Sequence, residues 1–457
     1  MLQAYSSSRA FLGKYVVASV LAAAALLLFG NAAWAEKAKN DRAARLLQTI
    51  PIPVSTDNNT AGGLYSFDIS WIDQTTGIYY LADRSNKRVQ IVDADTGTFL
   101  TAISASPSFA GVSPPAFGTG TAGPNGVTTS GHCLFVTDAP SRVVSFDTSS
   151  FPPTQVSSVK TDPSSPNRAD ELAVDPTDSL ILAINNADTP PFGTFIKFAP
   201  STCALTPPLS PGADRITFVL PPVDATNGAE QPLWDPVTQK FYVSIPQIGP
   251  LLLSGGVVRI DPTTKMIDRT FPVFFCQPAG ITKGPKNDAL LGCNTVFDTA
   301  GAEWDANDAN TAAPLQLILN LQTGRVDQVA GVGGSDEVWF NPGDGNYYTG
   351  SSRTPLGATT AGGGTVLASS AAILGVIDAK DQELLQLVPT YNVAAVTTGP
   401  GSGLHPSGTA HSVAVDAFNN HIFVALAANN VFPNCLTGCI AVYWHGDEDV
   451  AGQAALP

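Results

Sequence analysis

Positive charge is scarce in this sequence. Only 13% of its 457 residues are charged, and 38 Asp and Glu outnumber 23 Lys and Arg, which gives a formal net charge of −15. An acidic balance of this size argues against nucleic acid or an anionic lipid surface as a partner. The chain also holds 41 Gly and 36 Pro. That composition disfavours long helices and favours many short strands joined by turns.

The sequence motifs of several enzyme classes are missing. We find no Gly-x-Ser-x-Gly elbow, no phosphate-cradling loop and no dinucleotide fingerprint, which argues against serine hydrolase and dinucleotide chemistry. There is also no Cys-x-x-Cys with a second matching pair, which disfavours a structural zinc site.

One long apolar run is present, and it stands near the start of the chain. Arg9 and Lys14 precede or flank the run from Tyr15 to Phe29, and residues 33–35 (Ala-Trp-Ala) form a small-x-small cleavage site. This pattern predicts a signal peptide over residues 1–35 and a mature chain over 36–457 with a net charge near −17, because cleavage removes two positive charges. We expect an exported protein, periplasmic or extracellular, with no membrane insertion after cleavage. An uncleaved N-terminal anchor is the alternative.

The six Cys of an exported chain are expected to form disulfides. Two pairs are suggested by proximity along the chain, and the third follows by elimination. The predicted pairs are Cys435–Cys439, Cys276–Cys293 and Cys133–Cys203.

The most informative feature is an internal repeat of fifty-odd residues. Each copy holds short apolar strands separated by tight turns, the pattern of one four-stranded propeller blade. Seven copies are found, at residues 67–100, 125–160, 170–205, 230–271, 277–329, 336–387 and 411–445. Three of them share a turn that opens with Asp and soon reaches Thr, at Asp73, Asp175 and Asp235.

The two ends of the repeat array complement each other. The seventh copy has room for about three strands, while Leu46 to Val54 looks like an outermost strand without a blade. Joining the two would close the ring and remove an open sheet edge. We therefore predict an all-β fold, a single propeller of seven four-stranded blades closed by an N-terminal outer strand. Six or eight blades behind a disordered leader are the alternatives.

Residues 79–97 (YYLADRSNKRVQIVDADTG) resemble NHL and YVTN-type propellers and the wider senescence-marker/gluconolactonase group of six-bladed lactonases. The resemblance covers nearly the whole mature chain as a pattern of blades. It implies the fold more than the chemistry, because propellers host many unrelated functions. In the gluconolactonase-like group, polar residues at the starts of the innermost strands hold a divalent cation, so the resemblance implies a cation site at the tunnel mouth.

Six of the seven copies carry a metal-ligand type of residue at one aligned position, five residues before the polar residue that ends the first strand. These mouth residues are Asp68, Asn125, Asp170, Glu230, Asp336 and His411; the fifth copy has Pro278. Four carboxylates in one tunnel would repel one another, and few Lys or Arg stand near them in the sequence, so a cation is the simplest counter-charge. We expect Ca²⁺, with Mg²⁺, Mn²⁺ or Zn²⁺ as alternatives. The other interpretation is a polar tunnel mouth that hydrogen-bonds backbone and water.

These residues predict a metal-assisted hydrolase that acts on a small lactone or ester. The cation would polarise the carbonyl and lower the pKa of a bound water, and Asp336, Glu230 or His411 would accept the proton. The alternative is a non-catalytic propeller that binds a small molecule or a protein. Asp83 and Asp138, each at the end of a second strand, are expected to be structural acceptors for loop N–H groups.

Overall fold

The computed structural model describes residues 43–58, 63–112, 119–208, 212–219, 224–225, 227–303, 312–351, 373–390, 411–429 and 432–445. The chain separates into a unit formed by Arg45–Trp444 and a second unit formed by Met1–Ala44 and His445–Pro457. The predicted signal peptide lies outside the described residues, so its cleavage site stays a prediction. Among the described residues no helix is long and apolar enough to cross a membrane.

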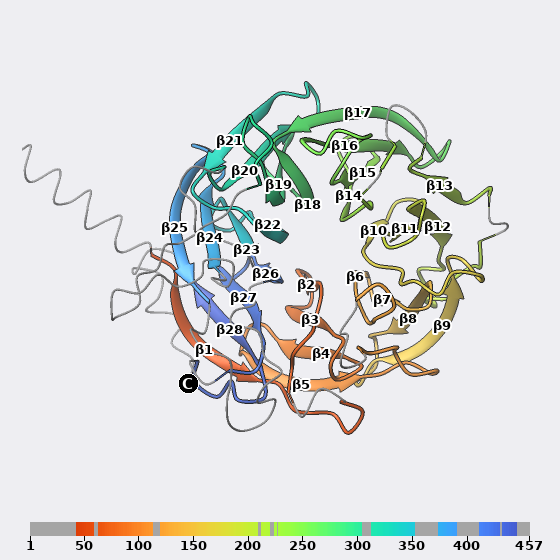
Figure 1. Ribbon diagram of the computed structural model, residues 1–457. Helices are drawn as coiled ribbons and strands as arrows, with labels where there is room; N and C mark the ends of the chain where they lie inside the picture. The colour runs from red at the N-terminus through yellow and green to blue at the C-terminus, as the bar shows by residue number, and fades with distance from the viewer. Residues whose placement is uncertain are drawn as a thin grey trace, which may run out of the picture. The chain divides into compact units, whose positions relative to one another are not determined.

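The unit Arg45–Trp444 is a ring of seven antiparallel four-stranded sheets (Figure 1). From the tunnel outward, the first blade is β2 (Ser70–Asp73), β3 (Ile78–Asp83), β4 (Arg88–Asp93) and β5 (Thr98–Ile103). The second is β6 (Val127–Ser130), β7 (Cys133–Asp138), β8 (Arg142–Asp147) and β9 (Thr154–Lys160). The third is β10 (Leu172–Asp175), β11 (Leu180–Asn185), β12 (Phe192–Lys197) and β13 (Arg215–Thr217), and the fourth is β14 (Pro232–Asp235), β15 (Lys240–Ile245), β16 (Ser254–Asp261) and β17 (Met266–Phe274).

The fifth blade is β18 (Cys276–Lys283), β19 (Asp288–Val296), β20 (Leu315–Asn320) and β21 (Val326–Ala330), and the sixth is β22 (Ser335–Asn341), β23 (Asn346–Ser351), β24 (Ile373–Asp378) and β25 (Glu383–Pro389). The seventh is β26 (Val413–Asp416), β27 (His421–Leu426), β28 (Cys439–Trp444) and β1 (Arg45–Pro51). The predicted seven-bladed propeller is confirmed.

The closure of the ring is also confirmed. β1 pairs antiparallel with β28, with Ile50 opposite Ile440 and Pro51 opposite Cys439. Figure 1 shows the red strand β1 beside the blue strand β28, so the two ends of the propeller unit share one blade. Because β1 is the outer strand of the seventh blade, the edge of β28 is paired rather than open.

Burial follows position within the blade. Every residue of the second strands β7, β11, β23 and β27 is buried. These strands face a neighbouring blade on both sides, which explains their nearly continuous apolar sequences. The rim strands β9 and β25 consist mostly of exposed and partly buried residues, with one buried residue each. Blades pack through apolar clusters, as where the rings of Tyr79 and Phe423 stack 5.2 Å apart between the first and seventh blades.

The shared Asp turns follow from side-chain chemistry. The carboxylate of Asp73 accepts a hydrogen bond from Thr75 N at 2.9 Å, and Asp175 accepts one from Thr177 N at 2.9 Å. Asp235 repeats the arrangement in the fourth blade. An Asp that opens a tight turn satisfies the backbone N–H two residues later, which is why the repeat keeps it.

The third blade differs from the prediction in one respect. The third copy was expected to end near Leu205, but its fourth strand is β13, which is only three residues long and begins at Arg215. The intervening loop brings Cys203 against β7 of the second blade. All three predicted disulfides are present: Cys133–Cys203, Cys276–Cys293 and Cys435–Cys439.

Candidate functional site

The mouth residues occupy one end of the inner strands, as the alignment predicts. In four blades the N–H of the mouth residue donates to a carbonyl of the adjacent second strand, at the same place in the blade. The donors are Asp68, Asn125, Asp170 and Glu230, at N···O distances of 2.9, 3.0, 2.7 and 2.9 Å. Because the backbone position is the same, the side chains enter the same end of the tunnel.

Three of the mouth residues converge. His411 Nε2 lies 3.0 Å from Asp68 Oδ1 and 2.8 Å from Asp336 Oδ2, and one ligand atom from each of the three residues lies within 4.8 Å of the others. Burial disfavours the charged imidazole, but the two carboxylates outweigh it and raise the pKa of His411 to about 10. At neutral pH His411 is therefore the cation between two anions.

Two of the remaining mouth residues, Asn125 and Asp170, have arginine partners. The Arg84 guanidinium follows β3 and is buried; it pairs with Asp68, donates to Asn125 Oδ1 at 2.8 Å and lies 3.8 Å from Asp170 Oδ1. Arg168 pairs with Asp170 Oδ2 at 2.6 Å. Burial alone would raise the pKa of Asp68, but Arg84 and His411 outweigh it and hold that pKa well below its usual range.

The sequence-based argument for a metal therefore rested on a wrong premise. It assumed that no basic residue balances the mouth carboxylates, whereas Arg84 and Arg168 both do so. Arg84 lies in the loop after the second strand of its blade, so an alignment of the innermost strands does not include it. Arg168 stands two residues before Asp170, and that spacing was the one signal in the sequence that could have revealed it.

Glu230 keeps a distinct environment. Its carboxylate accepts only a long hydrogen bond of 3.4 Å from Asn186 Nδ2 among the described residues. Burial first, and then the charges of Asp170 and Asp336, raise the pKa of Glu230 to about 8. Glu230 is thus a carboxyl group that can exchange a proton near neutral pH, which is the property required of a general acid or base.

Gly126 beside Asn125 marks a close contact between blades. The N–H of Gly126 donates to the Asp170 carbonyl at 2.8 Å, and a Cβ at Gly126 would lie 2.6 Å from that oxygen. The close packing of the second blade against the third therefore explains why a glycine follows Asn125.

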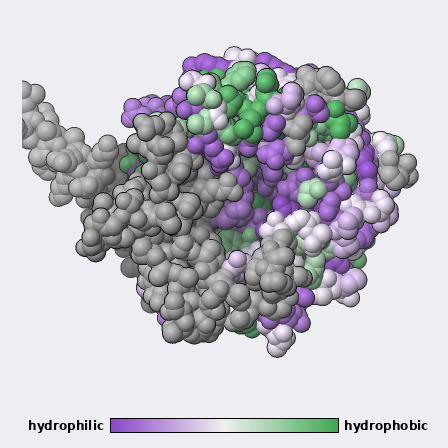
Figure 2. All heavy atoms as spheres, in the orientation of Figure 1, coloured by the Kyte–Doolittle hydropathy of each residue, from purple (hydrophilic) through white to green (hydrophobic). Residues whose placement is uncertain are grey.

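A cavity of about 390 Å³ runs along the inner strands next to this mouth. Its walls begin one residue beyond the mouth residues and reach the last residues of the strands, Ser130 and Lys283. Three half-buried indoles, Trp71, Trp234 and Trp339, are part of the wall. We call this cavity the tunnel cavity. Figure 2 shows one face of the molecule, with hydrophilic residues gathered around a hollow at its centre.

Two buried acids in the tunnel cavity were missed by the sequence analysis. Glu171 and Glu337 are 7% and 1% exposed, and each directly follows a mouth residue. Glu171 Oε2 and Glu337 Oε1 have no hydrogen-bond partner among the described residues. Burial raises the pKa of Glu337 to about 8, and it raises that of Glu171 well above the usual range. A comparison of the residues at the position after the mouth residue would have found them.

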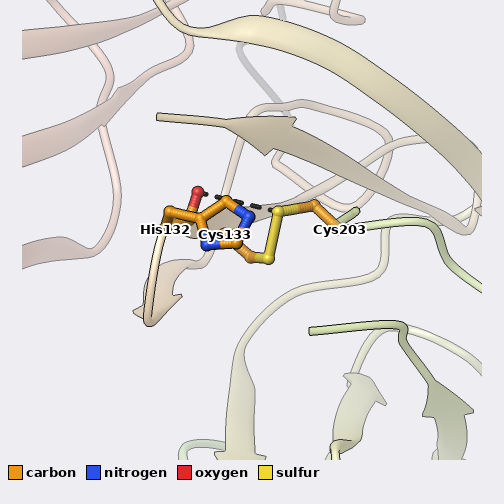
Figure 3. A group of neighbouring side chains, drawn as sticks. All are labelled: His132, Cys133 and Cys203. Carbon is orange, nitrogen blue, oxygen red and sulfur yellow. Dashed lines mark hydrogen bonds between the residues drawn. A yellow bond between two sulfur atoms is a disulfide. The ribbon is translucent and has the colours of Figure 1, made fainter. Parts of the chain in front are cut away.

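A second group with metal-ligand atoms lies between the second and third blades. It comprises His132, Cys133 and Cys203 (Figure 3). The two sulfur atoms are bonded to each other, and Cys203 Sγ lies 3.6 Å from the carbonyl oxygen of His132. Because the thiolate is the metal ligand, the disulfide removes both sulfur ligands and leaves no metal site here.

The comparisons with known proteins support the fold alone. No family model matches the chain, and no curated protein matches it. A hydrazine synthase structure from Kuenenia stuttgartiensis is similar with a TM-score of 0.57 and 11% identity, over 86% of this chain and 98% of that chain. The WD40 propeller domain of Doa1 is similar with a TM-score of 0.51 and 10% identity, over 89% of this chain and 98% of that chain.

These likenesses place the chain among seven-bladed β-propellers. They do not establish the likeness to NHL propellers or lactonases, and at such identities they carry nothing about activity.

Proposed function

We propose that this protein is a ligand-binding propeller whose tunnel cavity holds a small molecule. The observation that carries the proposal is the cavity itself, whose volume of about 390 Å³ falls within the range of small-molecule sites. Its wall combines indole rings with a few buried polar groups, which is the usual composition of such sites. Three of the four mouth carboxylates are already paired with Arg84, Arg168 or His411, so binding rather than metal chemistry is the simpler function.

The test uses three probes of one shape and different charge: choline, 3,3-dimethylbutan-1-ol and 3,3-dimethylbutanoate. Tryptophan fluorescence and calorimetry would detect binding, because three indoles line the cavity. We expect at least one probe to bind with one-to-one stoichiometry. Val174→Phe adds a ring at a half-buried wall position and should weaken that binding about tenfold or more. Val237→Phe, at a site 71% exposed, is the matched control and should change nothing. Failure of all three probes at millimolar concentration would refute the proposal.

A second candidate function is the metal-assisted hydrolysis of a small lactone or ester. It is favoured by the convergence of Asp68, Asp336 and His411, since three protein ligands with open positions suit a catalytic cation. Such a cation would polarise a carbonyl and activate water, and Glu230 would accept the proton. An oxygen-rich set with one imidazole suits Mn²⁺ or Zn²⁺ as well as Ca²⁺.

The two candidates differ in their response to cations. A ligand that binds only the folded state at 100 times its Kd adds about 2.7 kcal/mol of stability. If the hydrolase hypothesis holds, Ca²⁺, Mg²⁺, Mn²⁺ or Zn²⁺ should raise the melting temperature, a chelator should lower it, and His411→Ala should remove the response. Asp83→Ala should keep it, because Asp83 is not part of the converging group of Asp68, Asp336 and His411. An unchanged melting curve with every cation would leave the binding function alone.

The three disulfides are consistent with an oxidising compartment. Because the N-terminal apolar run points the same way, we propose that the mature chain functions outside the cytoplasm.

A further inference from the structure

We propose that the ligand of the tunnel cavity is an organic ammonium ion, with its charge facing the wall carboxyl groups of Glu171 and Glu337 and its carbon skeleton against the indoles. This inference rests on the proposed binding function and adds the chemical class of the ligand.

Two carboxyl groups on the cavity wall each keep a buried oxygen without a partner among the described residues. Glu337 Oε2 is fixed, because it accepts hydrogen bonds from Val413 N at 2.9 Å and Ser70 N at 3.3 Å. Its Oε1 is buried without a partner among the described residues, and so is Glu171 Oε2. A buried acceptor without a partner costs free energy. A cation beside either oxygen would reduce that cost through its charge.

The basic residues nearby leave these oxygens available. Lys283 is the one Lys or Arg on the described cavity wall, and its ammonium donates to the carbonyls of Gly284 and Lys286 within its own turn. Arg84 and Arg168 do not line the cavity and are engaged with Asp68 and Asp170. The two arginines therefore serve the mouth, whereas the free oxygens of Glu171 and Glu337 have no basic partner among the described residues.

The aromatic wall selects an organic cation over a metal ion. Trp71 and Trp339 pack edge to face with ring centroids 5.1 Å apart. The indole N–H of Trp71 donates a hydrogen bond of 2.9 Å to Thr129 Oγ1, which fixes the orientation of that ring. Indole faces attract ammonium groups, and they offer nothing to a hydrated Ca²⁺ or Mg²⁺. A cavity of about 390 Å³ is also far larger than one ion requires.

The experiment compares choline with its neutral isostere, 3,3-dimethylbutan-1-ol, on the intact protein at pH 8.5, above the pKa of about 8 to which burial raises the Glu337 carboxyl. Calorimetry should show choline binding at least about tenfold more tightly than the alcohol. Glu171→Gln and Glu337→Gln should each weaken choline about tenfold and leave the alcohol unaffected. Glu383→Gln, the same exchange at an exposed residue of β25, is the matched control. Alcohol binding also reports whether each variant is folded.

The outcomes separate the two proposals. If the alcohol or 3,3-dimethylbutanoate binds as tightly as choline and Val174→Phe weakens it, the cavity binds ligands but the ammonium assignment is wrong. If no probe binds, the binding function fails together with it. If choline binds best but both Gln variants keep full affinity, the carboxyl groups do not recognise the charge and the inference is overturned.

Discussion

Arg84 is the residue on which the charge balance of the tunnel mouth depends most. It is 4% exposed and joins mouth residues from the first, second and third blades. Arg84→Met would leave the Asp68 carboxylate buried with less compensation, and breaking a buried pair in this way costs about 3–5 kcal/mol. We expect that loss in chemical denaturation. The double variant Arg84→Met with Asp68→Asn should recover much of it, since no unpaired charge remains.

The ion pair of Arg88 and Asp57 on the surface, 2.7 Å apart, is the control for the Arg84 variants. Arg88→Met should cost no more than about 1 kcal/mol, because solvent screens an exposed pair. A loss at Arg84 as small as that at Arg88 would contradict the role assigned to the buried guanidinium.

Asp83 and Asp138 have the structural role that the sequence predicted. Both are fully buried. Asp83 accepts hydrogen bonds from Asn86 N at 2.9 Å, Asn86 Nδ2 at 2.6 Å and Gln90 Nε2 at 2.8 Å, and Asp138 accepts one from Ala110 N at 3.1 Å. Each Asp therefore orders the loop or loops around it, which explains why the two positions look alike in the sequence.

The Asp83 carboxyl predicts a pH dependence of stability. Burial outweighs its hydrogen bonds and raises its pKa from 3.8 to about 6. A raised pKa means that the folded state binds the proton more tightly than the unfolded state does. The free energy of unfolding therefore falls by about 2–3 kcal/mol as pH rises from 4 to 7 through this group. Asp83→Ala lacks this term, so the variant should be destabilised more at pH 4 than at pH 7. Equal losses at both pH values in urea titrations would contradict the assignment.

At the scale of the element, β1 determines whether the ring is closed. Ile50 is 3% exposed and packs in the cluster shared by the seventh and first blades, whereas Leu47 on the same strand is 44% exposed. Ile50→Ala should cost about 2–5 kcal/mol and Leu47→Ala much less. Deleting residues 36–56 should lower the melting temperature further, because it reopens the edge of β28. A deletion variant that melts at the wild-type temperature would refute the closure.

The disulfides act over different lengths of chain. Cys133–Cys203 spans 70 residues and links the second and third blades, whereas Cys435–Cys439 spans 4. In the chain-entropy model the difference in loop length amounts to about 2.5 kcal/mol. Replacing both Cys of the first pair by Ala should therefore lower the free energy of unfolding more than the same change at the second pair. The reverse order would show that strain or solvation, not chain entropy, dominates.

At the scale of the whole molecule, the predicted signal peptide can be tested directly. Protein purified from the native host should begin near Glu36. Its intact mass should rise by six hydrogens on reduction, two for each disulfide. A mature chain that begins at Met1, or six free thiols before reduction, would show that the chain is not processed and exported as predicted.

The sequence by itself determined the architecture. Seven blades, the closing strand and the cysteine pairs could be predicted because each is written in a local pattern: strand and turn spacing, an orphan strand at one end, and Cys positions within the repeats. The mouth residues could be found for the same reason, since one blade position recurs in every copy. Blade packing then follows from the apolar second strands without further information.

Only the tertiary structure decided what balances the mouth and where a ligand could bind. Arg84 lies in the loop after β3 and contacts Asp68, Asn125 and Asp170, which belong to three different blades. A contact between blades does not recur along the sequence, so the repeat pattern cannot predict it. Glu171 and Glu337 are ordinary acids in the sequence, and they become exceptional only when the ring closes around them and removes water from one oxygen of each. Charge compensation and desolvation depend on three-dimensional neighbours, so they are properties of the closed ring rather than of any single blade.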